Sequence, residues 1–273
     1  MDWFSQQLPV AQAALAGLFT WGMTAFGAAS VVVLRTVGRR LFAGMLGLAA
    51  GIMLAASFFS LLLPALELAT AGSLPPFVPV VLGFLAGGAC IRGIDAILPH
   101  LHPRRGLREG PMTSWRRSTL LVTAITLHNL PEGLALGVAF GAVGAAADAG
   151  GTEAATLGAA VALTIGVGFH NLLEGATVAV PLRAEGHSRG RSFWYGQLSG
   201  AVEPIAAVFG AVAVATIGSL LPYALAFAAG AMIFVVVEEF IPESQSDVAH
   251  HDLATLALMV GFVLMMFLDT ALA

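Results

Sequence analysis

Two hexapeptides inside apolar runs carry the side chains best suited to chemistry in this sequence. The first is HNLPEG at residues 128–133, and the second is HNLLEG at residues 170–175. Each places a histidine and a glutamate four residues apart, which on a helix puts both side chains on one face. Imidazole nitrogen and carboxylate oxygen form a ligand set for first-row divalent metals. The repeat therefore predicts a metal site built by two helices.

Two further side chains are candidate metal ligands. Glu203 lies in an apolar run and precedes Pro204, which has no N–H and so frees a backbone carbonyl in its helix. Pro131 should kink the helix of the first hexapeptide for the same reason. Met53 offers a thioether, although a methionine on its own is more typical of core packing. Two histidines and three glutamates exceed the needs of one four-coordinate zinc, so we expect two adjacent metal positions bridged by carboxylates.

The composition is that of a membrane protein. Of the 273 residues, 58% are hydrophobic and 10% are charged, and the mean hydropathy is +0.88. A soluble domain carries about 25% charged residues. The one cysteine, Cys90, excludes an intrachain disulfide and a cysteine-rich metal cage. The basic residues are all arginines in short clusters, which indicates loops rather than a nucleic-acid surface.

The apolar runs predict how these residues are positioned. A membrane helix needs about 20 apolar residues, and the loops between the runs are too short for a soluble domain. We expect one all-α domain over residues 1–273, a polytopic bundle of eight membrane helices with the hexapeptides on the fourth and fifth. The sixth and seventh runs nearly fuse at Leu221-Pro222, so seven helices remain an alternative. The predicted helices cover about residues 10–34, 41–63, 77–98, 118–143, 156–182, 193–220, 222–241 and 251–272.

The arginines predict the orientation of the bundle. They cluster after the first, third and fifth helices, whereas the second, fourth and sixth connections have none. By the positive-inside rule the arginine loops face the cytoplasm, which places both termini outside the cell membrane. For a bacterial chain this would be the inner membrane.

An intramembrane metal-dependent protease is the alternative function. Zinc proteases of this kind use HExxH, in which the glutamate beside the first histidine is the catalytic base. Here Asn129 stands in that place, and the chain has no GxSxG motif. Ligands spread over three or four helices suit permeation better than hydrolysis, so we expect a transporter and no enzyme.

These residues together resemble the ZIP family of divalent-metal transporters, in its bacterial branch. Besides the two hexapeptides, the resemblance covers GQLSGAVEP at residues 196–204, VVVEEFIPE at residues 235–243, and the predicted topology. It implies movement of zinc into the cytoplasm through a binuclear centre, with cadmium, iron or manganese as further candidate cargo. It also implies that the first, fourth, fifth and sixth helices slide against the others.

The resemblance assigns roles to the candidate ligands by position. The implied main site contains Met53, His128, Glu132, His170 and Glu174, and the implied neighbouring position adds Asn129, Asn171 and Glu203. Many relatives have glutamine in place of His170 and aspartate in place of Asn171. His170 should therefore favour zinc-like ions, whereas the neutral Asn171 should weaken the second position. Leu173 replaces a proline, which removes a reason for the fifth helix to kink.

The resemblance also suggests where ions are collected and released. Glu67 would collect them outside, and Asp95, Glu239 and His250 with His251 would receive them inside. For the histidine pair an ordinary loop is an equal alternative. The expected partners are divalent metal ions, the lipid bilayer and, as a candidate, a second copy in a homodimer. No nucleic acid is expected.

Overall fold

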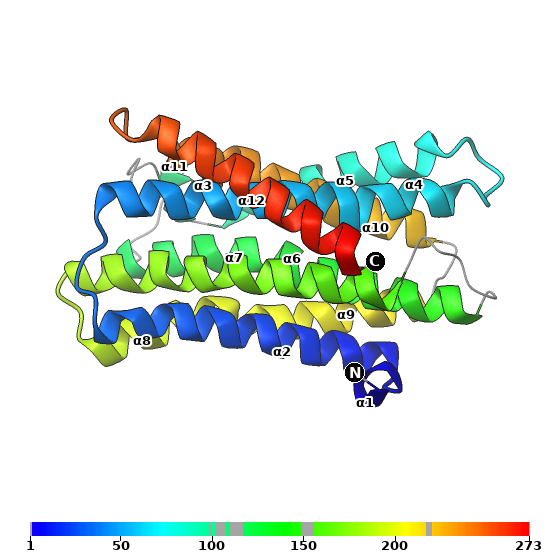
Figure 1. The fold of residues 1–273 in the computed structure, drawn as a ribbon, viewed down its shortest axis with the longest axis horizontal. Helices are drawn as coiled ribbons and strands as arrows, with labels where there is room; N and C mark the ends of the chain where they lie inside the picture. The colour runs from blue at the N-terminus through cyan, green and yellow to red at the C-terminus, as the bar shows by residue number, and fades with distance from the viewer. Residues whose placement is uncertain are drawn as a thin grey trace.

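Long helices lie side by side along the longest axis of the molecule, and both chain ends lie toward the same end of the bundle (Figure 1). The computed structural model describes residues 2–98, 100–101, 108–109, 117–148, 156–216 and 220–272. Much of the arginine loop after the third predicted helix is outside these ranges. Within it, β1 (His100–Leu101) and β2 (Arg108–Glu109) form one short antiparallel pair.

The α-helices follow the apolar runs of the sequence. Inside a bilayer a chain must satisfy its backbone polar groups internally, and a helix does this within one segment. The α-helices are α1 (Asp2–Ser5), α2 (Pro9–Ala28), α3 (Arg39–Ala55), α4 (Leu63–Ala69), α5 (Phe77–Ile97), α6 (Arg117–Asp148), α7 (Leu157–Ala184), α8 (Arg189–Leu198), α9 (Val202–Thr216), α10 (Leu221–Val235), α11 (Ile241–Ser244) and α12 (His251–Leu272).

Seven helical stretches of the described residues are long and apolar enough to cross a membrane. They are Pro9–Val32, Arg39–Ala69, Phe77–Ile97, Leu157–Ala184, Arg189–Thr216, Leu221–Ser244 and His251–Leu272. The all-helical, multi-pass architecture predicted from composition is thereby confirmed. The sequence predicts eight crossings, and α6, which carries the first hexapeptide, is not one of these seven.

Prolines mark three places where the helices leave the α-helical geometry. The π-helices η2 (Ala56–Leu62) and η5 (Val236–Phe240) end shortly before Pro64 and Pro242, and the 3₁₀ turn η3 (Ser199–Ala201) ends before Pro204. A proline ring clashes with the carbonyl four residues earlier and offers no N–H, so a wider or tighter turn relieves the conflict. By contrast, α6 runs through Pro131 as one uninterrupted helix.

One helix is longer than its apolar run predicts. The second predicted helix ends near residue 63, whereas α3, η2 and α4 continue as one helical stretch to Ala69. The wider π turn lets the helix pass Pro64 instead of stopping there. Glu67 consequently lies in the last turns of a helix.

Glycines allow four helix pairs to approach until backbone meets backbone. A Cβ added at any of these glycines would overlap a carbonyl of the facing helix, so no larger residue fits without a shift. Small residues serve membrane helices in this way generally. The contacts are Gly51 with Leu258 (α3 and α12), Gly87 with Phe227 (α5 and α10), Gly137 with Ala207 (α6 and α9), and Gly175 with Thr24 (α7 and α2).

These pairs divide the bundle into two helix groups. The first group contains α2, α6, α7, α8 and α9 with η3, and the second contains α3, α4, α5, α10, α11 and α12 with η2 and η5. In Figure 1, α6 and α7 lie between the rest of the first group on one side and α3, α10 and α12 on the other. The groups meet where α3 and α12 contact α7 and where α10 contacts α6. At this seam Gly166 faces the flexible side chain of Met265 rather than a backbone.

Candidate metal centre

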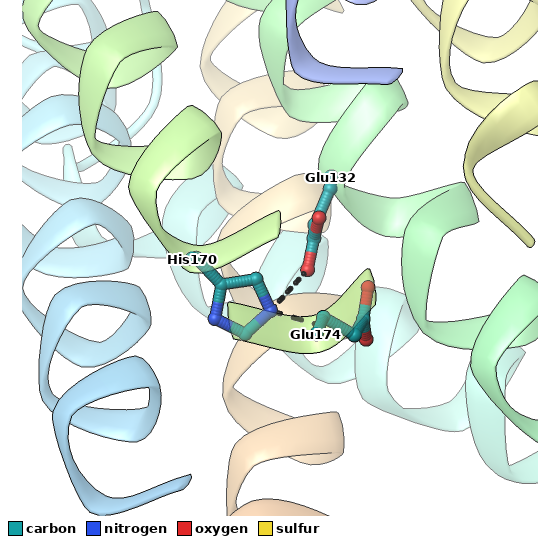
Figure 2. Close-up of side chains that lie close together, drawn as sticks. All are labelled: Glu132, His170 and Glu174. Carbon is teal, nitrogen blue, oxygen red and sulfur yellow. Dashed lines mark ion pairs between the residues drawn. The ribbon is translucent and has the colours of Figure 1, made fainter. Parts of the chain in front are cut away.

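Glu132, His170 and Glu174 form a compact cluster between α6 and α7. The Nε2 atom of His170 lies 3.0 Å from Oε1 of Glu132 and 4.0 Å from Oε1 of Glu174. Figure 2 shows both carboxylates beside the same ring nitrogen. One ligand atom from each residue lies within 4.8 Å of the other two. Three donors that converge this closely can hold one metal ion.

The helical spacing of the sequence explains the cluster. His170 and Glu174 are one turn apart on α7, and α6 brings Glu132 to the same point from the neighbouring helix. All three side chains are buried, with relative exposures of 0%, 0% and 1% for Glu132, His170 and Glu174. The two hexapeptides therefore meet in the interior of the bundle.

The carboxylates of this cluster have few partners of their own. None of the four oxygens of Glu132 and Glu174 accepts a hydrogen bond of good geometry from a described residue, although the Asn129 amide lies beside Glu174. Burying an ionised carboxylate without compensation is strongly unfavourable. A divalent cation would supply the missing compensation, so the donor set fits a metal.

His128 lies apart from this cluster, although the sequence groups it with His170. Its Nε2 atom is 3.6 Å from Oε1 of Glu239 on η5. The ring of Phe240 contacts both imidazoles, with centroid distances of 5.8 Å to His128 and 5.0 Å to His170. A cavity of about 40 Å³ is lined by His128, Glu239, Phe240 and Glu243. His128 thus faces this cavity, and Phe240 packs against both histidines.

A second polar network surrounds Glu203 at the start of α9. The Nδ2 atom of Asn171 donates to Oε2 of Glu203 at 2.6 Å and to the carbonyl of Thr20 at 3.3 Å. The hydroxyls of Thr20 and Thr24 also lie against the Glu203 carboxylate. All four side chains are buried. The structure thus brings Asn171 and Glu203 together as predicted neighbours, with two threonines added.

The sequence interpretation missed these threonines. Thr20 and Thr24 are four residues apart in the first apolar run, so they share one face of α2. That spacing could have indicated a polar face on this helix. Which helix this face would contact depends on tertiary packing.

Met53 lies on the other side of the seam. It is buried on α3, and its carbonyl accepts a hydrogen bond of 2.8 Å from Ser57. One turn earlier on α3, the backbone of Ala49 lies against the His170 ring. Met53 therefore belongs to the helix that covers the cluster from the second group.

The predicted outer and inner groups occupy different environments. Glu67 is exposed on α4, and Asp95 is half-buried on α5. Glu239 is buried at 8% exposure, whereas its neighbour Glu238 is exposed. Of these inner acids, Glu239 is thus the one that faces the cavity beside His128.

Two other polar sites lie away from the cluster. His250 is half-buried, and the exposed His251 lies 3.2 Å from Asp252 and contacts the carbonyl of Val248. On α12, Asp269 accepts a hydrogen bond of 2.6 Å from Ser60. Asp269 is buried at 8% exposure and was not among the predicted ligands.

Comparison with known proteins gives consistent matches. The family model described as ZIP zinc transporter matches residues 108–269. Zinc transporter ZIP11 of Bos taurus is 42% identical, over 97% of this chain and 98% of that protein. Zinc transporter ZIPB of Bordetella bronchiseptica is 41% identical, over 96% of this chain and 82% of that protein. Zinc transporter GufA of Myxococcus xanthus is 39% identical, over 94% of this chain and 98% of that protein.

Proposed function

Because this chain belongs to the ZIP family of zinc transporters, we propose that it moves zinc across a cell membrane into the cytoplasm. The observation that carries the proposal is the buried cluster of Glu132, His170 and Glu174 inside a multi-pass helical bundle. Imidazole and carboxylate donors suit zinc. The protease alternative is not favoured, because the chain's relatives are named as transporters.

The cluster would hold the principal ion. Met53 and His128 would add two further ligands to this ion. They would do so when α3 and the His128 ring move toward the cluster during transport. Asn129, Asn171 and Glu203 would form the second, weaker position, which opens only when Asn171 releases Glu203. Cadmium, iron and manganese are candidate cargo as well. The order of affinities of such a site for divalent metals depends mainly on the metal and not on the site.

A path through the protein follows from where the other acids and histidines lie. Glu67 would collect cations outside the membrane. An ion that leaves the cluster would next meet His128 and Glu239 at the cavity. Asp95 and His250 would receive the ion at the end of the bundle where the arginine loops lie. At each step protein ligands would be exchanged for water or for other ligands.

We also propose that α6 is an eighth crossing. Its 32 residues span about 48 Å, more than the roughly 30 Å of a hydrocarbon core. Both chain ends lie toward the same end of the bundle (Figure 1), which supports an even number of crossings. The arginine loops would then be cytoplasmic and both termini outside, in a bacterial inner membrane. Residues 1–273 would form one transporter domain, with a second copy as a candidate partner.

The two helix groups suggest how access could alternate. Backbone contacts at glycines hold each close pair together, whereas Gly166 at the seam meets a side chain. Sliding of the first group against the second would carry the cluster without separating its ligands, since α6 and α7 both belong to the first group. In many transporters access alternates by a rigid-body movement of one helix bundle against another.

Uptake into proteoliposomes tests the proposed function. Zinc, cadmium, iron and manganese should be compared side by side with the wild-type chain and with a Glu132→Ala, His128→Ala double variant. We expect the double variant to lose uptake, because it removes one ligand of the cluster and the next ligand on the path. Glu238→Ala is the matched control, since that acid is exposed. Normal zinc uptake by a folded double variant would refute the proposed site.

A further inference from the structure

The two halves of the polar centre differ in how their carboxylates are compensated. In the cluster, the Nε2 atom of His170 is the polar atom beside the carboxylates of Glu132 and Glu174. In the second half, Glu203 already receives the Asn171 amide at 2.6 Å. The hydroxyls of Thr20 and Thr24 lie against the same carboxylate. Oε2 of Glu203 therefore accepts a hydrogen bond of good geometry, whereas neither oxygen of Glu132 or Glu174 accepts one from a described residue.

The orientation of the Asn171 amide follows from its surroundings. Its nitrogen faces two acceptors, the Glu203 carboxylate and the Thr20 carbonyl. Turning the amide over would place its oxygen against both of them and lose both hydrogen bonds. The N–H groups must therefore point at the place from which a cation would bind Glu203.

From this geometry we propose that the Asn171 amide takes the place of a second cation, so that the centre carries one ion in each transport cycle. The inference rests on the proposed function and adds to it the number of ions that are carried in each cycle. A second ion would have to displace a donor from a buried carboxylate, and hydrogen bonds to charged groups are the stronger ones. We expect the second position to bind zinc about 10- to 100-fold more weakly than the first.

The fold keeps this arrangement in place. Thr20 and Thr24 come from α2, Asn171 from α7 and Glu203 from α9, so the network joins three helices of the first group. A Cβ at Gly200 would meet Thr24 Oγ1 at 2.8 Å and Glu203 Oε1 at 2.9 Å. The glycine thus leaves the space in which this hydroxyl and this carboxylate lie near each other.

Counting bound ions tests the inference directly. The purified full chain in detergent is dialysed against zinc chloride, and zinc per chain is measured by mass spectrometry. We expect one zinc for the wild-type chain and two for Asn171→Asp, which replaces the donor by a carboxylate of nearly the same size. Adding Glu203→Gln to Asn171→Asp should restore one zinc, because only one of the two facing carboxylates remains.

The outcomes separate the failure of this inference from the failure of the proposed function. Two zinc ions of similar affinity on the wild-type chain, with normal uptake, would overturn the single-ion inference alone. No bound zinc and no uptake would overturn both. X-ray absorption at the zinc edge needs no variant: the zinc-saturated wild-type chain should show no metal neighbour at about 3.5–4 Å, the spacing of two-metal sites. Such a neighbour would also overturn the inference.

Discussion

The two helix groups contribute unlike chemistry to the centre. The first group supplies the whole cluster of Glu132, His170 and Glu174 as well as the network around Glu203. The second group supplies Met53, which is buried on α3, and the Glu239-Phe240 pair on η5, which lines the cavity. The difference suggests that the first group determines how tightly an ion is held. The second group would then determine how the ion reaches and leaves the cluster.

Disturbing the packing inside the first group should have the largest effect. In Gly175→Ala the new methyl group would overlap the carbonyl of Thr24, whose hydroxyl belongs to the Glu203 network. Overpacking a core generally costs about 1–3 kcal/mol. We expect a lower midpoint of thermal unfolding in detergent, together with reduced zinc uptake.

Two further glycine variants compare packing inside the first group with packing at the seam between the groups. Gly22→Ala on α2 is the matched control, because a Cβ there meets nothing within 4 Å. Gly166→Ala lies at the seam against the side chain of Met265, which can move, so it should destabilise less than Gly175→Ala. Equal destabilisation by Gly166→Ala and Gly175→Ala would contradict the division into two groups.

A smaller effect is expected where the second group meets the histidines. The Phe240 ring packs against both His128 and His170, so Phe240→Ala would free space beside both imidazoles. His128 could then turn toward the cluster and add a ligand, which should tighten zinc binding several-fold. Competition with a chelator of known affinity measures this change.

The control for this variant keeps the bulk of the side chain. Phe240→Leu still fills much of the space beside the imidazoles and should bind zinc much as the wild type does. If Phe240→Ala leaves zinc affinity unchanged while His128→Ala weakens it, His128 reaches the cluster without needing that space. In that case the ring has no part in keeping His128 from the cluster.

Local spacing accounts for most of what the sequence could predict. The four-residue separation of His170 from Glu174 places both on one face of α7 whatever the tertiary fold. Composition alone predicts the multi-pass helical class, because few charged residues accompany long apolar runs. The meeting of Glu132 with His170 followed from the repeat of the motif in the next predicted helix.

Contacts between distant helices could not be predicted in this way. Thr20 is 151 positions before Asn171, and nothing in either helix indicates that the two would meet. The pairing of His128 with Glu239 likewise joins α6 to a residue far along the chain, and Glu239 lies on the π-helix η5. A helical wheel with 3.6 residues per turn misplaces residues after such a segment.

The smallest effect is expected at Glu67, in the second group. Glu67 is exposed on α4, where its charge can attract cations but cannot hold them in a dry site. Screening by salt limits such attraction to about 10 Å at 0.1 M. Glu67→Gln should therefore slow zinc uptake by about twofold or less at low ionic strength, and by almost nothing at high salt. Uptake rates at two salt concentrations test this, with the exposed Glu238→Gln as the control. A large loss that persists at high salt would mean that Glu67 ligates the ion directly, and that the second group also contributes to holding it.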